Sequence, residues 1–69
     1  MDILKTFGNN IKRIRIEKKM SQLNLSFKCD LHRNYICDVE RGKRNVSLIA
    51  IEKLAKGLDV DIKELFEEK

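Results

Sequence analysis

Apolar residues recur at intervals of three and four along almost the whole chain, which is the spacing that gathers side chains on one face of an α-helix. In the first segment the residues expected to share that face are Ile3, Leu4, Phe7, Ile11 and Ile14. Lys12, Arg13 and Glu17 fall elsewhere around the same helix. The pattern therefore predicts an amphipathic first helix.

Two shorter helices are expected after Ser21, whose hydroxyl can accept a bond from an unpaired backbone N–H and so cap a helix. The second helix runs from Gln22 to about Lys28, and Cys29-Asp30-Leu31 is expected to form a tight turn. The third runs from about Arg33 to Glu40 or Arg41. It ends at Gly42, because glycine adopts a left-handed conformation without a Cβ penalty.

The predicted third helix has two different sides. The inward side carries Ile36, Val39 and Glu40, with Tyr35 at its border. The other side carries polar or small residues, namely Arg33, Asn34, Cys37, Asp38 and Arg41. A carboxylate on the inward side needs a cation as its partner.

Two more helices complete the predicted fold. Ser47 is expected to cap a fourth helix, whose core face carries Leu48, Ile51, Leu54, Ala55 and Leu58. Asp61 and Glu64 are spaced as in a capping box, which begins a last short helix with Ile62, Leu65 and Phe66. We therefore predict an all-α fold of five short helices, in one domain that spans residues 1–69.

Length and composition narrow the class of protein. The chain has 69 residues, 38% of them charged, no proline and three glycines, which argues against a β-sandwich. No apolar run approaches the roughly 20 residues that span a bilayer. The start, residues 1–5, lacks the features of a signal peptide. We expect a cytoplasmic protein without a membrane partner.

Charge is distributed unevenly along the chain. The net charge is +4, but residues 1–45 hold 11 Lys and Arg against 5 Asp and Glu, whereas residues 46–69 hold 4 against 6. The first two thirds are therefore basic and the last third slightly acidic. Such an asymmetry suggests a polyanionic partner for the front part of the chain, with ordinary surface charge as the alternative.

The cysteines and the histidine do not point to a cofactor or to catalysis. Cys29 and Cys37 lie eight residues apart, and His32 is the only histidine, so the usual four ligands of a metal site are not available. A nucleophile that pairs His32 with either cysteine would lack an orienting group and a pocket of about 300 Å³. We expect two reduced thiols, no metal or other cofactor, and no enzyme activity.

Helix, turn and helix form the supersecondary unit of many DNA-binding domains. The major groove admits one α-helix, arginine can donate two bonds to guanine, and asparagine can pair with adenine. Arg33 and Asn34 occupy the start of the third helix, where side chains reach base edges. Gln22 is placed for a phosphate or an outer base, and the loop Lys43-Arg44-Asn45 for flanking phosphates.

Three stretches carry a family resemblance: Ser21-Gln22-x-x-Leu25, Leu31-His32-Arg33-Asn34-Tyr35-Ile36, and Val39-Glu40-Arg41-Gly42-Lys43-Arg44-Asn45-Val46-Ser47-Leu48. They resemble the lambda-repressor/Cro-like (XRE) helix-turn-helix family. Within it, LHRNYICDVERGKRNVSL is most similar to the controller proteins of restriction–modification systems. The resemblance covers nearly the whole chain. Asn34 replaces the usual threonine, which alters the preferred base, and Asp30 and Lys19 replace common glycines.

The resemblance implies a transcriptional regulator that binds a palindromic operator on double-stranded DNA as a homodimer. Arg33 and Asn34 would read bases. The other residues of the implied DNA-binding set, for backbone or flanking bases, are Gln22, Tyr35, Arg41, Lys43, Arg44 and Asn45. The resemblance also suggests Arg15 as the structural partner of Glu40.

The dimer seam is expected within residues 47–68. Ile49 lies off the core face of its helix, and an exposed isoleucine near Val60, Ile62 and Phe66 suggests a partner surface. A lone surface isoleucine is the alternative. Bound to DNA, the dimer would either recruit or block RNA polymerase.

Two other functions stay open on the sequence alone. A phage-type repressor or an antitoxin would share the fold and the DNA binding. A protein-interaction module that has lost DNA binding is the alternative from another class, although the basic start of the third helix argues against it.

Overall fold

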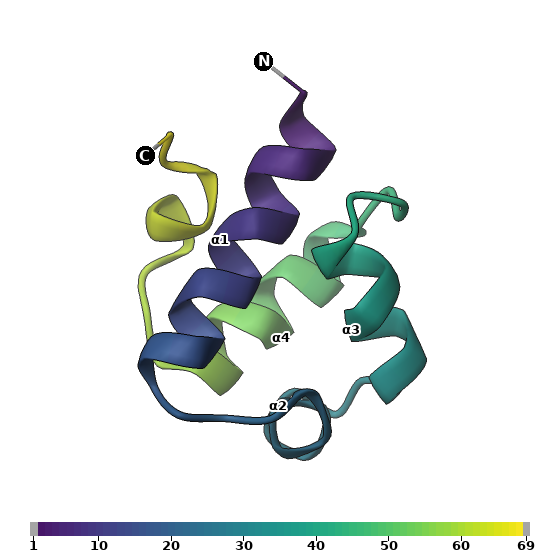
Figure 1. The fold of residues 1–69 in the computed structure, drawn as a ribbon, viewed down its shortest axis with the longest axis vertical. Helices are drawn as coiled ribbons and strands as arrows, with labels where there is room; N and C mark the ends of the chain where they lie inside the picture. The colour runs from purple at the N-terminus through teal and green to yellow at the C-terminus, as the bar shows by residue number, and fades with distance from the viewer. Residues whose placement is uncertain (1, 69) are drawn as a thin grey trace.

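A computed structural model describes residues 2–68 of the chain. Over that range it contains four α-helices, one 3₁₀ helix and no β-strand (Figure 1). These elements are α1 (Ile3–Glu17), α2 (Gln22–Cys29), α3 (Arg33–Glu40), α4 (Leu48–Leu58) and the 3₁₀ helix η1 (Ile62–Phe66). The all-α prediction is confirmed. The prediction of five α-helices is wrong in its last member, because this short segment takes the tighter winding in which residue i bonds residue i+3.

Helix α1 runs through the middle of the molecule and contacts α3, α4 and η1 (Figure 1). Helix α2 lies across the end of the bundle, seen end-on in Figure 1, and packs against α3 and α4. The two ends of the described chain both lie toward the opposite end of the molecule from α2 (Figure 1). As a result, α3 is supported by α1 and α2 and leaves its remaining surface open.

Every helix contributes to a single core. The largest side chains with almost no exposure are Ile11, Leu25, Ile36, Val39, Leu54, Leu58 and Leu65. Each fully buried side chain of this size stabilises the fold by about 1.5–3 kcal/mol relative to an exposed one. The three- and four-residue spacing of the sequence therefore located most of the interior.

Two residues assigned to inward faces lie outside the core. Ile3 is 55% exposed and Leu48 is 84% exposed. Both stand at the first position of their helix, where the apolar face extends beyond the elements that pack against it. The helical period predicts which side a residue occupies, but not how far along the helix its neighbours reach.

The predicted helix boundaries agree closely with the structure. Ser21 caps α2 by accepting from the backbone N–H of Asn24 at 3.0 Å, and Ser47 caps α4 by accepting from that of Ala50 at 3.1 Å. Helix α2 extends one residue further than expected, so the turn begins at Asp30. The φ of Asp30 is 56°, which lies in the left-handed region that favours glycine. Aspartate can replace the common glycine because it tolerates this region better than most residues.

Two glycines that the sequence did not single out set the approach of the helices. A Cβ added to Gly8 in α1 would lie 2.2 Å from the carbonyl oxygen of Val39 in α3. A Cβ added to Gly57 in α4 would lie 2.3 Å from Sγ of Cys29 in α2. Glycine therefore lets α1 approach α3, and α4 approach α2, more closely than any other residue would.

The contact between Gly57 and Cys29 leads to a prediction about stability. Gly57→Ala should lower the free energy of unfolding by about 1–3 kcal/mol, because the new methyl group overlaps a buried sulfur. In the Cys29→Ala background the same change should cost much less, since the remaining contacts, to backbone N and Cα of Cys29, are 3.3 and 3.4 Å. Urea unfolding of the two single variants and the double variant measures the coupling. Additive losses would contradict the assigned contact.

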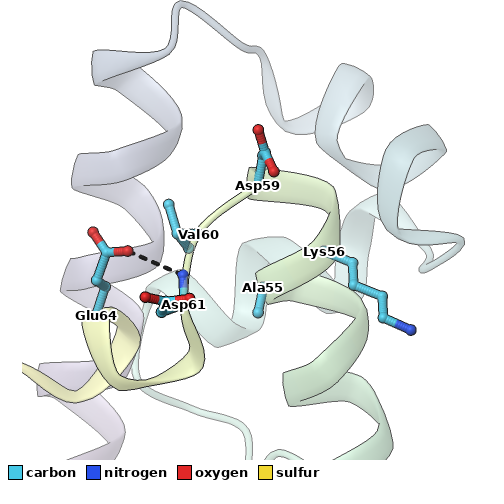
Figure 2. A pocket seen from close by; sticks show the side chains of 6 residues that line it. All are labelled: Ala55, Lys56, Asp59, Val60, Asp61 and Glu64. Carbon is cyan, nitrogen blue, oxygen red and sulfur yellow. Dashed lines mark hydrogen bonds between the residues drawn. The ribbon is translucent and has the colours of Figure 1, made fainter.

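The junction between α4 and η1 is a short turn (Figure 2). Asp59 ends α4 with a φ of 57°, and the backbone N–H of Asp61 donates to Oε2 of Glu64 at 3.0 Å. This bond is the Glu64 half of the predicted capping box. Val60 lies in the turn, half-buried, and lines a shallow depression with the end of α4. Val60 also packs against the core.

Candidate nucleic-acid interface

Helices α2 and α3 and the turn between them form a rigid unit. The backbone N–H of Leu31 donates to the carbonyl oxygen of Ser26 at 3.1 Å, which closes the turn after the left-handed Asp30. The Ser26 hydroxyl is buried and donates to the carbonyl oxygen of Leu23 at 2.6 Å. These hydrogen bonds tie the turn to the last part of α2 and so fix where α3 begins.

The start of α3 presents polar side chains to solvent. His32 caps the helix, and its Nδ1 accepts from the backbone N–H of Asn34 at 3.1 Å. Arg33 and Asn34 are exposed, and neither side chain forms a hydrogen bond or an ion pair with any residue in the range 2–68. Both are therefore available to an external ligand.

The inward side of α3 is as expected from the helical period. Ile36 and Val39 are buried, Glu40 is 8% exposed, and Tyr35 is half-buried at the border. Apolar contacts to the core and one buried carboxylate thus fix which side of α3 faces outward. Arg33 and Asn34 are exposed on the opposite side as a consequence of this packing.

Glu40 is held by a network of charge-assisted hydrogen bonds. Arg15 donates to it twice, from Nε to Oε2 at 2.7 Å and from Nη2 to Oε1 at 3.0 Å. Arg15 also donates from Nη1 to the carbonyl oxygen of Met20 at 2.8 Å. This ion pair, between the end of α1 and the end of α3, lies almost completely out of water and orients the two helices relative to each other.

Gln22 joins the same network. Its Nε2 donates to Oε1 of Glu40 at 3.0 Å, so the carboxylate accepts a third hydrogen bond. Because a carboxylate only accepts, the Gln22 amide must keep its nitrogen toward Glu40. The sequence predicts that Gln22 contacts a phosphate or an outer base, and the structure adds that the start of α2 is tied to the end of α3 through it.

The loop after α3 begins at Gly42, whose φ of 72° is in the left-handed region. Arg44 folds back along α3, with its guanidinium 4.9 Å from the centre of the Tyr35 ring. It also forms an ion pair with Asp38 at 3.4 Å. Both ends of this pair are partly exposed, so the pair is weak and easily released.

The other loop residues of the predicted set extend outward. Arg41, Lys43 and Asn45 are exposed. Among the described residues neither Arg41 nor Lys43 has an ion-pair partner, whereas Arg44 has one. Exposed cations that lack an internal partner are the groups that attract phosphates.

A separate apolar groove lies at the start of α4. It has a volume of about 340 Å³ and is lined by Leu48, Ile49, Ile51, Glu52, Ile62 and Phe66. Ile49 is 69% exposed, and Ile62 is 48% exposed. Three of the four residues predicted for the seam therefore meet in this groove, and Leu48 adds to it. Val60 does not line it; it lines the other depression, at the end of α4, and packs against the core.

The cysteines are separated by their surroundings. Burial raises the pKa of the Cys29 thiol to about 11, so it stays protonated near neutral pH. Cys37 is half-buried. Residues 2–68 contain no group of three or more His, Cys, Asp and Glu side chains placed to hold a metal ion. No helix in that range has both the length and the apolar character to cross a membrane.

Known proteins share this sequence and geometry. The helix-turn-helix family profile matches residues 11–65. The control protein C.BamHI of Bacillus amyloliquefaciens is 55% identical over 62 residues, which cover 88% of this chain and 76% of that protein. The restriction-modification controller protein C.AhdI from Aeromonas hydrophila superposes with a TM-score of 0.89 at 48% identity, over 91% of this chain and 96% of that one.

A structure of the controller protein C.Esp1396I bound to a 19 base pair DNA duplex also matches, with a TM-score of 0.85 and 39% identity, over 93% of this chain and 85% of that chain. The fold that carries the exposed start of α3 in this chain is thus similar to one that is known in a complex with DNA. The chain belongs to the helix-turn-helix family of DNA-binding transcription regulators and, within it, to the controller proteins of restriction–modification systems.

Proposed function

We propose that the protein binds a palindromic operator as a homodimer, with one α3 helix of each protomer in the major groove. Arg33 would donate to guanine O6 and N7, and Asn34 would pair with adenine or another base edge. The observation that carries this proposal is the pair of exposed, unengaged side chains at the start of a helix whose other side is fixed by Glu40 and Arg15.

The remaining polar residues of the interface would position the dimer on the duplex. Arg41, Lys43 and Asn45 lie in or beside the exposed loop and suit flanking phosphates. Tyr35 and Arg44 would contact the backbone or flanking bases once Arg44 exchanges its weak pair with Asp38 for a phosphate. Gln22 would bind at the edge of the same surface, from the start of α2.

Occupancy of the operator would be the regulatory mechanism. Depending on where the operator lies, the bound dimer either recruits RNA polymerase or blocks it. The protein would regulate its own promoter and the adjacent restriction gene. It would act in the cytoplasm, where the DNA that it binds lies. The relatives named as controllers of restriction–modification systems support this assignment.

We place the dimer seam at the groove that contains Ile49, Ile62 and Phe66. A two-fold axis at this seam would have to set the two α3 helices one turn of duplex apart, about 34–36 Å, because operators with half-site symmetry require that spacing. Leu48, Ile49 and Ile62 are all exposed in this groove. An apolar patch of this kind on a 69-residue chain favours a surface that a second copy covers.

The seam can be tested with one charged substitution. Ile49→Glu should raise the dissociation constant of the dimer by about 100-fold or more, because a carboxylate would have to lose its water inside the seam. Sedimentation velocity measures this effect. Ile16→Glu, at a residue of α1 that is 54% exposed and lies outside the groove, is the matched control. The control should dimerise like the parent. If Ile49→Glu also dimerised as tightly as the parent, the seam would lie elsewhere.

Selection of bound duplexes from a random DNA pool tests the function as a whole. We expect enrichment of one sequence with two-fold symmetry, bound with a steep dependence on salt. Recovery of unrelated sequences, with no binding to genomic fragments at low salt, would instead favour a protein-interaction module.

A further inference from the structure

His32 caps α3 with an imidazole, where serine, threonine, aspartate or asparagine is the common choice. It is the only histidine in the chain, and its side chain is exposed. Nδ1 accepts from the backbone N–H of Asn34 at 3.1 Å. Nothing in the fold assigned so far uses the other nitrogen of the ring.

The cap determines where the proton of the ring lies. A nitrogen that accepts a hydrogen bond carries no proton, and a neutral imidazole has one proton, so it must be on Nε2. Protonation of both nitrogens would destroy the acceptor and with it the cap. While the cap is formed, the N–H of the neutral ring therefore lies on Nε2, at its outer edge, and no residue in the range 2–68 accepts a bond from that N–H.

His32 and Arg33 stand on the same rim of an open groove of about 500 Å³ between the outer side of α2 and the start of α3, with Leu23 and Phe27 opposite. The groove is also lined by Asp30, and a ligand that enters it would meet both His32 and Arg33. An N–H with no acceptor beside it fits an oxygen that only accepts, as a phosphate oxygen does.

We propose that His32 is a further DNA contact, in which Nε2–H of the neutral ring donates to a phosphate oxygen of the operator. One ring would thus cap the reading helix through one nitrogen and bind the DNA backbone through the other. The proposal rests on the proposed function and adds a contact of a different kind from those of Lys43 and Arg44. A neutral donor displaces no counterion from DNA, so it strengthens binding without adding to the salt dependence.

Variants of His32 can separate the two nitrogens. His32→Ser keeps a good cap but has no distal donor, and His32→Ala removes both. A semisynthetic chain with a methyl group on Nε2 of His32 keeps the cap and removes only the N–H. Affinities for the selected operator and for random DNA are measured at pH 8, where histidines are ordinarily neutral, over a range of salt concentrations. Thermal unfolding monitors the cap.

We expect His32→Ser and the methylated chain to unfold at the temperature of the parent and to lose about tenfold in affinity per half-site for both kinds of DNA. Their salt slopes should match that of the parent. Three results would contradict the proposal. An unchanged affinity would mean that the contact does not exist, and a lower salt slope would mean that the contact is charged. A loss of affinity for the operator alone would mean that His32 contacts a base.

A ¹⁵N NMR measurement of the single imidazole tests the tautomer without DNA. The proton is expected on Nε2 in the free protein at pH 8, and a proton on Nδ1 would overturn the proposal at its first step. This measurement also separates the two levels of inference. If the parent protein selects no operator, the proposed function fails while the tautomer is still determined.

Discussion

Glu40→Ala is expected to lower the free energy of unfolding by about 3–5 kcal/mol, because it leaves Arg15 charged and unpaired in a nearly dry site. A domain of this length has a total stability of roughly 3–10 kcal/mol. The variant should therefore be largely unfolded or close to it at 37 °C. Circular dichroism during urea unfolding measures the loss.

A matched double variant separates the missing partner from the missing contact. Arg15→Met with Glu40→Leu removes both charges and fills their space with apolar groups, so most of the stability should return. Gln22 would then lack its acceptor, and operator affinity should stay below that of the parent. If Glu40→Ala alone cost less than about 1 kcal/mol, the pair would not be what orients α3.

Arg33→Ala is expected to lower the free-energy preference for the operator over random DNA by about 1–3 kcal/mol for each α3 helix, because the proposed bidentate contact to guanine is lost. In a dimer both helices lose it, so the ratio should fall by at least about 30-fold. Competition binding at one fixed salt concentration gives the ratio. Thermal stability should not change, since the side chain has no partner within residues 2–68.

Lys43→Ala is the control for this experiment. Lys43 is an exposed loop cation with no ion-pair partner in the described chain, and we expect it to bind a phosphate. Its loss should weaken binding to all sequences alike and lower the salt slope by about one unit per lost contact. If Arg33→Ala kept the affinity ratio of the parent, or behaved like Lys43→Ala, Arg33 would not be a base-reading residue.

Much of the architecture could be predicted from local signals. Ser21 and Ser47 cap helices where the sequence placed them, and Gly42 is left-handed as expected. The inward assignment of Glu40 was also accessible, because a helix that packs on one side has a fixed period. These features depend on neighbours within a few residues, so they are already present in the sequence.

Other features depend on which segments meet, and periodicity does not contain that information. Leu48 follows the apolar period but extends past the core, and Val60 lines a different depression from Ile62. The close contact of Gly8 with the backbone of Val39 has no sequence signal in a single chain. A resemblance to the family could suggest Arg15 for Glu40, but it did not reveal Gln22 as a third member.

The sequence by itself determined the positions of the four α-helices, the serine caps of α2 and α4, the helix-turn-helix unit and the residues at the start of α3, because all of these follow from spacing along the chain. Only the tertiary structure decided that Arg15, Gln22 and Glu40 form one network and that the apolar groove excludes Val60. Those features arise from contacts between helices, whose distances and directions are set by packing of the whole core.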